Sequence, residues 1–160
     1  MTRIIHAKTK AQYQSVRELF IQYADSLGFD LEFQGFSREL AGLPGDYKSP
    51  RGCILLAEGA DGHAGCVALR PLQKNICEMK RLFVIPAYQG SGVGRALAKV
   101  VIGEARKLGY QKMRLDTIES MKAAQGLYFS LGFKTIEAYC HNPLDNPSFM
   151  ELELYTAFQK

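Results

Sequence analysis

Apolar residues recur at the three-to-four-residue spacing of an amphipathic helix in several parts of the chain. The predicted helices, each followed or closed by a glycine that stops it, occupy residues 10–27, 36–45, 94–110 and 120–133. The strongest pattern, in residues 94–110, places Leu97, Val100, Val101 and Ala105 on one face and ends at Gly109. The sequence therefore predicts four helices of unequal length.

Runs of β-branched, aromatic or alternating residues predict the strands. These runs are residues 2–7, 53–58, 64–69, 75–86, 112–118, 133–140 and 149–156. Asp61-Gly62 makes a hairpin of the second and third runs, and the turn-rich residues 141–148 join the last two. In the fourth run the polar and apolar faces exchange at Arg81-Leu82, which predicts a β-bulge.

The order of these elements predicts an α+β fold with a hairpin-rich first half and a strand–helix–strand crossover in the second. No repeat or linker divides the 160 residues, so we expect a single domain over 1–160. No apolar run approaches the roughly 18 residues of a membrane span, and the N-terminus lacks the apolar segment of a signal peptide. We therefore expect a cytoplasmic protein with no membrane partner.

Cysteine spacing and charge narrow the chemistry further. The four cysteines form no CxxC pair, so we expect reduced thiols and no metal site. The net charge is only +4, but Arg95, Lys99, Arg106, Lys107, Lys112 and Arg114 follow one another against the single acid Glu104. This run is either the solvated face of a helix or a local positive field for a phosphorylated ligand. No basic run is interleaved with aromatic residues, so nucleic acid is not an expected partner.

A glycine cluster between a strand and a helix, Gln89 to Arg95, is the most informative stretch of the chain. The first amides of a helix have no partner within it and lie at the positive end of its dipole. Gly90, Gly92 and Gly94 leave those amides uncovered, which predicts a cradle for a pyrophosphate, with a purely structural turn as the alternative. Arg95-Ala96 replaces the lysine and hydroxyl of a Walker A loop, and a GxGxxG fingerprint would need glycine at Arg95.

Gln89 to Gly94 matches the Q/R-x-x-G-x-G/A signature of the GNAT superfamily of acetyl-CoA-dependent N-acetyltransferases, and the chain resembles that family over almost its whole length. "EMKRLFVIPAYQGSGVGRAL" is similar to the family's central strand, loop and helix, and "AAQGLYFSLGF" to its later helix. The resemblance implies a mixed, mostly antiparallel sheet with a splayed central pair of parallel strands, flanked by about four helices.

The resemblance also implies roles for particular residues. The acetyl-CoA pyrophosphate would lie on the backbone amides of the cradle, Gln89, Gly90, Ser91, Gly92, Val93, Gly94 and Arg95. The pantetheine arm would pair as an added strand with Leu82, Phe83 and Val84, where a backbone amide would also meet the oxyanion. Met121 stands where many members have an asparagine, and Ser120 is a candidate to supply the missing polar contact.

Two residues are predicted to be catalytic. Glu78 would be the base that deprotonates the acceptor amine, or alternatively a solvent-facing carboxylate of a strand. Tyr128 matches the tyrosine that, in the family the chain resembles, protonates the departing thiolate. The alternative is a buried aromatic residue of an amphipathic helix.

The predicted activity is transfer of an acetyl group from acetyl-CoA to a primary amine of a small molecule, by direct attack in a ternary complex. Acceptor specificity is expected from residues 28–36 and 139–149, which contain Asp30, Glu32, Tyr139, His141, Asn142 and Asp145. Acids at the entrance would favour a cationic amine. The alternatives are a protein or peptide acetyltransferase, transfer of another acyl group, and a non-catalytic acetyl-CoA sensor. The last strand leaves room for a homodimer.

Overall fold

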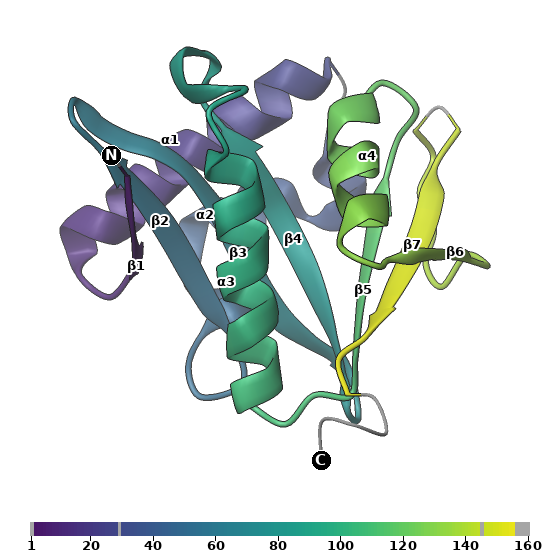
Figure 1. Cartoon of the computed structure of the whole chain (residues 1–160). Helices are drawn as coiled ribbons and strands as arrows, with labels where there is room; N and C mark the ends of the chain where they lie inside the picture. Colours follow the sequence, from purple (N-terminus) through teal and green to yellow (C-terminus); the bar gives the residue numbers. More distant parts are fainter. Residues whose placement is uncertain (1, 29, 145, 156–160) are drawn as a thin grey trace.

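The computed structural model describes residues 2–28, 30–144 and 146–155. Seven strands form one sheet in the order β1-β2-β3-β4-β5-β7-β6 (Figure 1). The strands are β1 Arg3–His6, β2 Cys53–Gly59, β3 Gly62–Gln73, β4 Ile76–Val84, β5 Lys112–Thr117, β6 Lys134–Ile136 and β7 Ser148–Glu153. The α-helices are α1 Lys10–Leu27, α2 Phe36–Ala41, α3 Val93–Lys107 and α4 Lys122–Ser130, and the short 3₁₀ helices are η1 Glu32–Gln34, η2 Gly45–Tyr47 and η3 Pro86–Tyr88.

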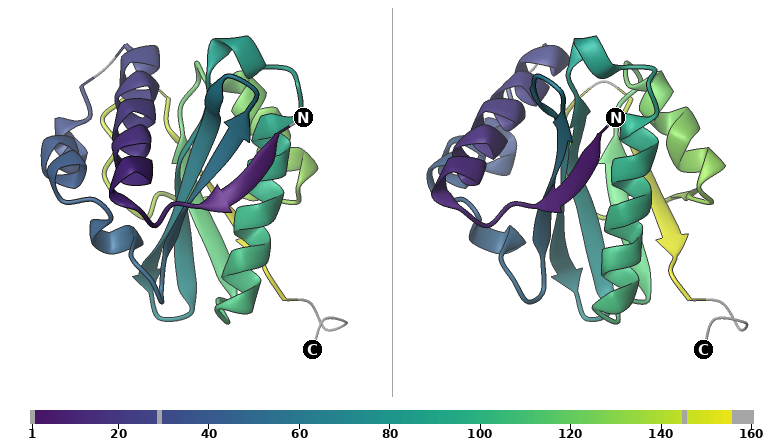
Figure 2. Two further views of the ribbon diagram at one scale, coloured as in Figure 1. Left: turned by 90° about the vertical axis from the view of Figure 1, so that its left-hand side faces the viewer. Right: turned by 60° about the vertical axis from the view of Figure 1, so that its left-hand side comes forward.

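The helices cover both faces of the sheet, with α1 and α2 on one side and α3 on the other (Figure 2). Two apolar clusters fill the two interfaces. Leu97, Val101 and Ala105 of α3 lie in the first cluster, together with Tyr128 of α4. Val16, Leu19 and Phe20 of α1 lie in the second. The described residues thus form one α+β domain, as the sequence predicts.

Strand β4 contains the predicted bulge. Cys66 pairs with Phe83 and Ala68 with Lys80, so Arg81 and Leu82 together oppose a single residue of β3. Arg81 adopts a left-handed backbone conformation, with φ 61°. The extra residue turns Lys80 and Arg81 to the same side of the sheet, where Lys80 donates to Gln34 of η1 and Arg81 lies over the ring of Tyr23 of α1.

Strands β4 and β5 are the only parallel neighbours among the described strands, and they separate along their length (Figure 1). Their register covers only Ile76↔Lys112, Cys77↔Met113 and Glu78↔Arg114. Beyond Glu78 the side of β4 that faces β5 has no strand partner within the described part of the chain. This confirms the splayed parallel pair and leaves backbone groups of β4 available to a ligand.

The strand expected over residues 133–140 was predicted too long, because β6 ends at Ile136. After it the chain turns over the open end of the β4–β5 pair. Tyr139 hydrogen-bonds to Glu78 of β4, and Asn142 hydrogen-bonds to Asp116 of β5. We call residues 137–144 the late loop. Side-chain contacts with two distant strands, rather than local propensity, determine its path.

Two general expectations can be compared with the structure. All four cysteines are free thiols, of which Cys66 and Cys77 are buried in strands and Cys140 is exposed in the late loop. None of the helices within the described ranges has the length and apolar character needed to cross a bilayer.

Candidate active site

The glycine cluster forms the turn between β4 and α3. Gly90 and Gly92 have φ angles of 81° and 92°, a region that glycine adopts readily and other residues do not. The first hydrogen bond of α3 joins the Ala96 amide to the Gly92 carbonyl over 3.0 Å, and no side chain caps the helix. The Gln89 and Ser91 amides donate to the Pro86 and Tyr88 carbonyls. The amides from Gly92 to Arg95 are therefore the ones available to an anion at the positive end of the helix.

Side chains next to the glycines fix the turn rather than fill it. Gln89 donates from Nε2 to the Val84 carbonyl over 3.0 Å, which ties the turn to the end of β4. The Ser91 hydroxyl donates to the Tyr88 carbonyl. Gly94 has an ordinary φ, and a Cβ there would meet only van der Waals contacts, so Gly90 and Gly92 are the two positions that require glycine conformationally.

A cleft of about 500 Å³ runs from this turn between the end of β4 and α4. We call it the cofactor cleft. The predicted cofactor residues that line it are Leu82, Phe83, Val84, Gln89, Gly90, Gly92, Gly94 and Arg95. Ser91 and Val93 do not line it, since the Ser91 hydroxyl faces Tyr88 and the Val93 side chain is buried in the core. Ser120 and Met121 also line the cleft.

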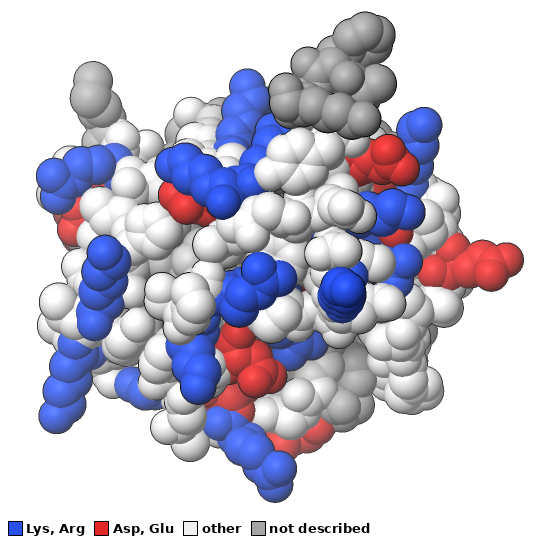
Figure 3. Space-filling model, turned by 90° about the horizontal axis from the view of Figure 1, so that it is seen from below, with Lys and Arg blue, Asp and Glu red and all other residues white. Residues whose placement is uncertain are grey.

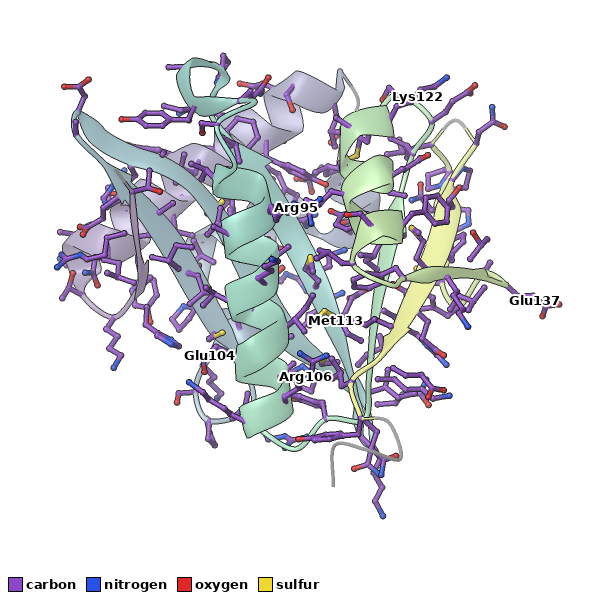
Figure 4. All side chains as sticks on the ribbon, in the orientation of Figure 1. Arg95, Glu104, Arg106, Met113, Lys122 and Glu137 are labelled. Atoms are coloured by element: carbon purple, nitrogen blue, oxygen red, sulfur yellow. The ribbon has the colours of Figure 1, made fainter. Side chains whose placement is uncertain are left out.

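The basic run predicted as a single field is dispersed in the structure. Arg95 alone of that run lines the cofactor cleft, on the side of α3 next to α4, where it donates to Ser130 over 2.9 Å (Figure 4). Arg106 donates to the Leu154 carbonyl, and Lys112 and Arg114 both pair with Glu151. On the face seen in Figure 3 the basic side chains are interspersed with acids. Most of the run therefore stabilises the fold or meets solvent.

A second, smaller cavity of about 30 Å³ adjoins the cofactor cleft. We call it the inner cavity. The two share Tyr23, Leu27, Leu82 and Met121, so they lie side by side. Polar side chains from four elements and the late loop line the inner cavity: Gln34, Lys80, Arg81, Asp116, Thr117, Tyr128 and Asn142.

Tyr128 reaches the inner cavity from α4. Its side chain is buried against Phe133, and burial raises the pKa of its phenol above the ordinary value. Its hydroxyl forms no hydrogen bond with a described residue. A phenol that stays protonated at the wall of the cavity has the form needed to donate a proton.

Glu78 is buried rather than solvent-facing, so the alternative of an exposed strand carboxylate is wrong. Its side chain is 2% exposed and both oxygens have partners. Oε1 accepts from Nε of Arg70 over 2.8 Å and lies 2.8 Å from its Nη2, and Oε2 accepts from the Tyr139 hydroxyl over 2.7 Å. Burial and Glu78 raise the pKa of Tyr139, which keeps its proton on the phenol. Glu78 does not line the inner cavity.

Asp116 is the carboxylate that does line the inner cavity. It stands on β5 beyond the last pair with β4, so it faces the space where the two strands separate. Its Oδ2 accepts from Nδ2 of Asn142 over 3.1 Å, and its Oδ1 lies 4.0 Å from Nζ of Lys80. The sequence analysis did not single out Asp116 or Lys80, because nothing in either strand shows where β4 and β5 diverge.

The residues expected to select the acceptor divide into two groups. Tyr139 and Asn142 hold the late loop over the inner cavity, as described above. Asp30 and Glu32 do not line either cavity, and their carboxylates accept hydrogen bonds from nearby backbone amides: Asp30 from that of Glu32, and Glu32 from that of Ser37. His141 is exposed and lines neither cavity. Asp145 lies outside the described residues.

The sequence profile described as "Acetyltransferase (GNAT) family" matches residues 13–133. The chain belongs to this family. An uncharacterized N-acetyltransferase of Schizosaccharomyces pombe is 44% identical over 135 residues, which cover 83% of each chain. The chain is accordingly an acyltransferase, in agreement with the sequence analysis.

Other relatives and a solved structure extend the comparison. An N-acetylaspartate synthetase of Xenopus tropicalis is 33% identical over 96 residues, covering 59% of this chain and 35% of the relative. The crystal structure of a GNAT-family acetyltransferase from Staphylococcus aureus superposes with a TM-score of 0.82 at 21% identity, covering 97% of this chain and 100% of that one. The latter shows that the fold is that of the GNAT family.

Proposed function

We propose that this GNAT protein transfers an acetyl group from acetyl-CoA to a primary amine of a small molecule, by direct attack of the amine. One observation carries the proposal: the cofactor cleft, with its uncovered helix amides, adjoins an inner cavity lined by a tyrosine and a carboxylate. A thioester held in the cleft and an amine held in the cavity would meet at the residues that the two share.

The residues of the cleft fit acetyl-CoA. The α3 amides and Gly90 and Gly92 would hold its pyrophosphate, since no Cβ covers the amides there. The unpaired side of β4 from Leu82 to Val84 would bind the pantetheine arm through backbone hydrogen bonds. Acetyl-CoA supplies an activated acyl group, and the protein supplies orientation and proton transfer.

Tyr128 is the proposed proton donor to the leaving thiolate. For the proton acceptor, the sequence points to Glu78 and the structure to Asp116. Both oxygens of Glu78 are occupied, so Glu78 would have to lose a partner before it could take a proton. Oδ1 of Asp116 accepts no hydrogen bond from a described residue and faces the inner cavity, which favours Asp116.

Direct attack is favoured over an acyl-cysteine route because no described thiol is activated. Burial raises the pKa of Cys53 and of Cys77 to about 12. Burial and the nearby Asp116 raise the pKa of Cys140. Burial also raises the pKa of Cys66, whose thiol donates to the Arg81 carbonyl. A thiol with a raised pKa is a weak nucleophile near neutral pH.

A small-molecule acceptor is favoured by the size of the inner cavity and by one relative. A cavity of about 30 Å³ receives only a compact group. The relative named N-acetylaspartate synthetase is named for an acetylated small molecule. Transfer to a protein terminus and transfer of another acyl group remain the alternatives within the family. We keep the proposed cytoplasmic location and the possible homodimer as predictions.

The first test is calorimetric titration with acetyl-CoA, with NADH as the control, followed by a screen of amines for release of the CoA thiol. Micromolar binding of acetyl-CoA without NADH binding, and thiol release that depends on an amine, would support the proposal. Absence of acetyl-CoA binding would overturn it. Thiol release that is as fast with peptides as with small-molecule amines would favour a protein acceptor.

A second test separates an enzyme from a sensor. Tyr128→Phe should lower kcat by roughly 10²- to 10⁴-fold, the usual contribution of a general acid, while the acetyl-CoA affinity stays within a factor of about two. Phe129 on the same helix is exposed, so Phe129→Tyr is a matched control that should leave both quantities unchanged. Equal turnover in Tyr128→Phe and the wild type would remove Tyr128 from the mechanism.

A further inference from the structure

Lys80 is a buried cation whose hydrogen-bonding capacity is mostly unused. Its side chain is 6% exposed, on β4 immediately before the bulge. An ammonium group has three donors, and one of them reaches Oε1 of Gln34 over 3.2 Å. The closest carboxylate oxygen, Oδ1 of Asp116, lies at 4.0 Å, beyond hydrogen-bond distance. Buried charges in proteins are normally paired and hydrogen-bonded, so the inner cavity presents an incompletely satisfied ammonium.

The two neighbouring cations, Arg81 and Arg70, differ from Lys80 because each is hydrogen-bonded to a carboxylate. Both Nε and Nη2 of Arg81 donate to Glu39, over 3.0 and 2.9 Å. Arg70 is bound to Glu78 as described above. Lys80 is therefore the cation of this cluster that lacks a hydrogen-bonded carboxylate among the described residues, and it lines the cavity.

Asp116 has the complementary property. Its Oδ1 faces Nζ of Lys80 across the 4.0 Å gap and accepts no hydrogen bond from a described residue. A direct Lys80–Asp116 hydrogen bond is not formed, and the gap leaves one donor site and one acceptor site side by side. A molecule whose amine and carboxylate stand on the same or adjacent carbons satisfies both sites at once.

We propose that the acceptor is an amino acid or a close analogue, whose carboxylate binds Lys80 and whose amine binds Asp116 in the inner cavity. The proposal rests on the acetyltransferase function above and names its substrate class. It replaces the expectation of a purely cationic amine, because Asp30 and Glu32 face neither cavity. A simple cation would leave the donors of Lys80 unsatisfied and place a second positive charge beside them.

The experiment compares the turnover of matched acceptors by the wild-type protein at saturating acetyl-CoA. The panel contains free amino acids, the carboxamide of each and the corresponding decarboxylated amine, with thiol release as the readout. We expect kcat/KM for the acids to exceed that for their carboxamides by roughly 10- to 100-fold, the value of a hydrogen bond to a charged group. The amine of a carboxamide is less basic than that of the corresponding acid, so a larger fraction of it is neutral and able to attack. This difference favours the carboxamides and therefore acts against the proposal.

Three variants locate the preference. Lys80→Met should abolish the preference for acids over their carboxamides, and Lys80→Arg should retain part of it. Lys74→Met, in the exposed turn between β3 and β4, is the control and should behave as the wild type. Calorimetry with acetyl-CoA and thermal melting verify that each variant is folded.

The outcomes are distinguishable. Equal kcat/KM for acids and carboxamides, or no turnover of any acid by a protein that binds acetyl-CoA, overturns the amino acid as acceptor. In the first case the acetyltransferase function stands. A wild-type protein that does not bind acetyl-CoA overturns the proposed function itself. A preference for acids that persists in Lys80→Met excludes Lys80 as its source.

Discussion

The Tyr139 hydroxyl donates to Oε2 of Glu78 over 2.7 Å, and this bond joins the late loop to the central strand. Glu78 itself is 2% exposed and is fixed from the other side by Arg70. The loop is held a second time where Asn142 donates to Asp116. The acid predicted as a base from its place in the sequence thus lies in a buried network that positions one wall of the inner cavity.

Tyr139→Phe should weaken this attachment. The variant removes a hydrogen bond to a buried carboxylate, worth about 1.5–3 kcal/mol, so Tm should fall by about 3–12 °C. The KM of the acceptor should rise several-fold with little change in kcat, because the loop borders the cavity and not the thioester. Thermal melting and steady-state kinetics measure both. Tyr13→Phe is the control, since the Tyr13 hydroxyl has no hydrogen bond to a described residue. A large fall in kcat without a change in KM would contradict the positioning role.

Glu78 and Asp116 can be separated as proton acceptors. Asp116→Asn should lower kcat by roughly 10²- to 10⁴-fold with acetyl-CoA affinity preserved, because the amide cannot take a proton from the amine. Glu78→Gln should resemble Tyr139→Phe in KM and destabilise the protein more, since it breaks a buried pair with Arg70. Asp61→Asn in an exposed turn serves as the control. If Glu78→Gln loses kcat and Asp116→Asn does not, the base is Glu78, as the sequence predicts.

Gly92 and Gly103 should respond to alanine in opposite ways. Gly92 has φ 92°, so Gly92→Ala strains the backbone by about 1–3 kcal/mol and moves the amides of the cradle. Acetyl-CoA affinity should fall at least about tenfold. Gly103 lies within α3 with no atom within 4 Å of an added Cβ, so Gly103→Ala should raise Tm by about 1–4 °C without changing affinity. Unchanged affinity in Gly92→Ala would mean that the glycines serve only the turn.

The preference for acids should decline at alkaline pH. Burial lowers the pKa of Lys80 below 10.5, and Arg81 and Arg70 lower it further, while Glu78 and Asp116 act in the opposite direction. As pH rises through the lowered pKa, Lys80 loses its proton and its attraction for a carboxylate. The ratio of kcat/KM for an acid to that for its carboxamide, each first divided by the neutral fraction of its own amine, should therefore fall as pH rises through the lowered pKa. The general base ionises in the same way with both substrates, so its contribution cancels in the ratio. A constant ratio would contradict a charged Lys80 at the site.

The same shift has a consequence for stability. A lysine with a lowered pKa in the folded state binds fewer protons there than in the unfolded chain, over the pH range between the two pKa values. The contribution of Lys80 to the free energy of unfolding consequently rises with pH in that range and is smallest below it. Comparison of Lys80→Met with the wild type by denaturant unfolding at several pH values measures this contribution.

The bulge in β4, the glycine turn and helix α3 could each be predicted from a short stretch of the sequence. The exchange of faces at Arg81-Leu82 predicted the bulge, because alternation has a period of two and an inserted residue shifts it visibly. The glycines at positions 90 and 92 predicted the turn, because few other residues adopt their backbone conformation. The amphipathic pattern of residues 94–110 likewise predicted α3 and its buried face.

The identity of the groups at the inner cavity was decided only by tertiary structure. Lys80, Asp116 and Asn142 are far apart in the chain, and each is unremarkable in its own segment. They come together because β4 and β5 pair at Glu78 and Arg114 and then separate, and because the late loop crosses the opening. The sequence itself determined which backbone conformations and buried faces are possible, since these depend on neighbouring residues. Which carboxylate is bound and which faces the cavity depends on contacts between distant strands, and only the folded chain establishes them.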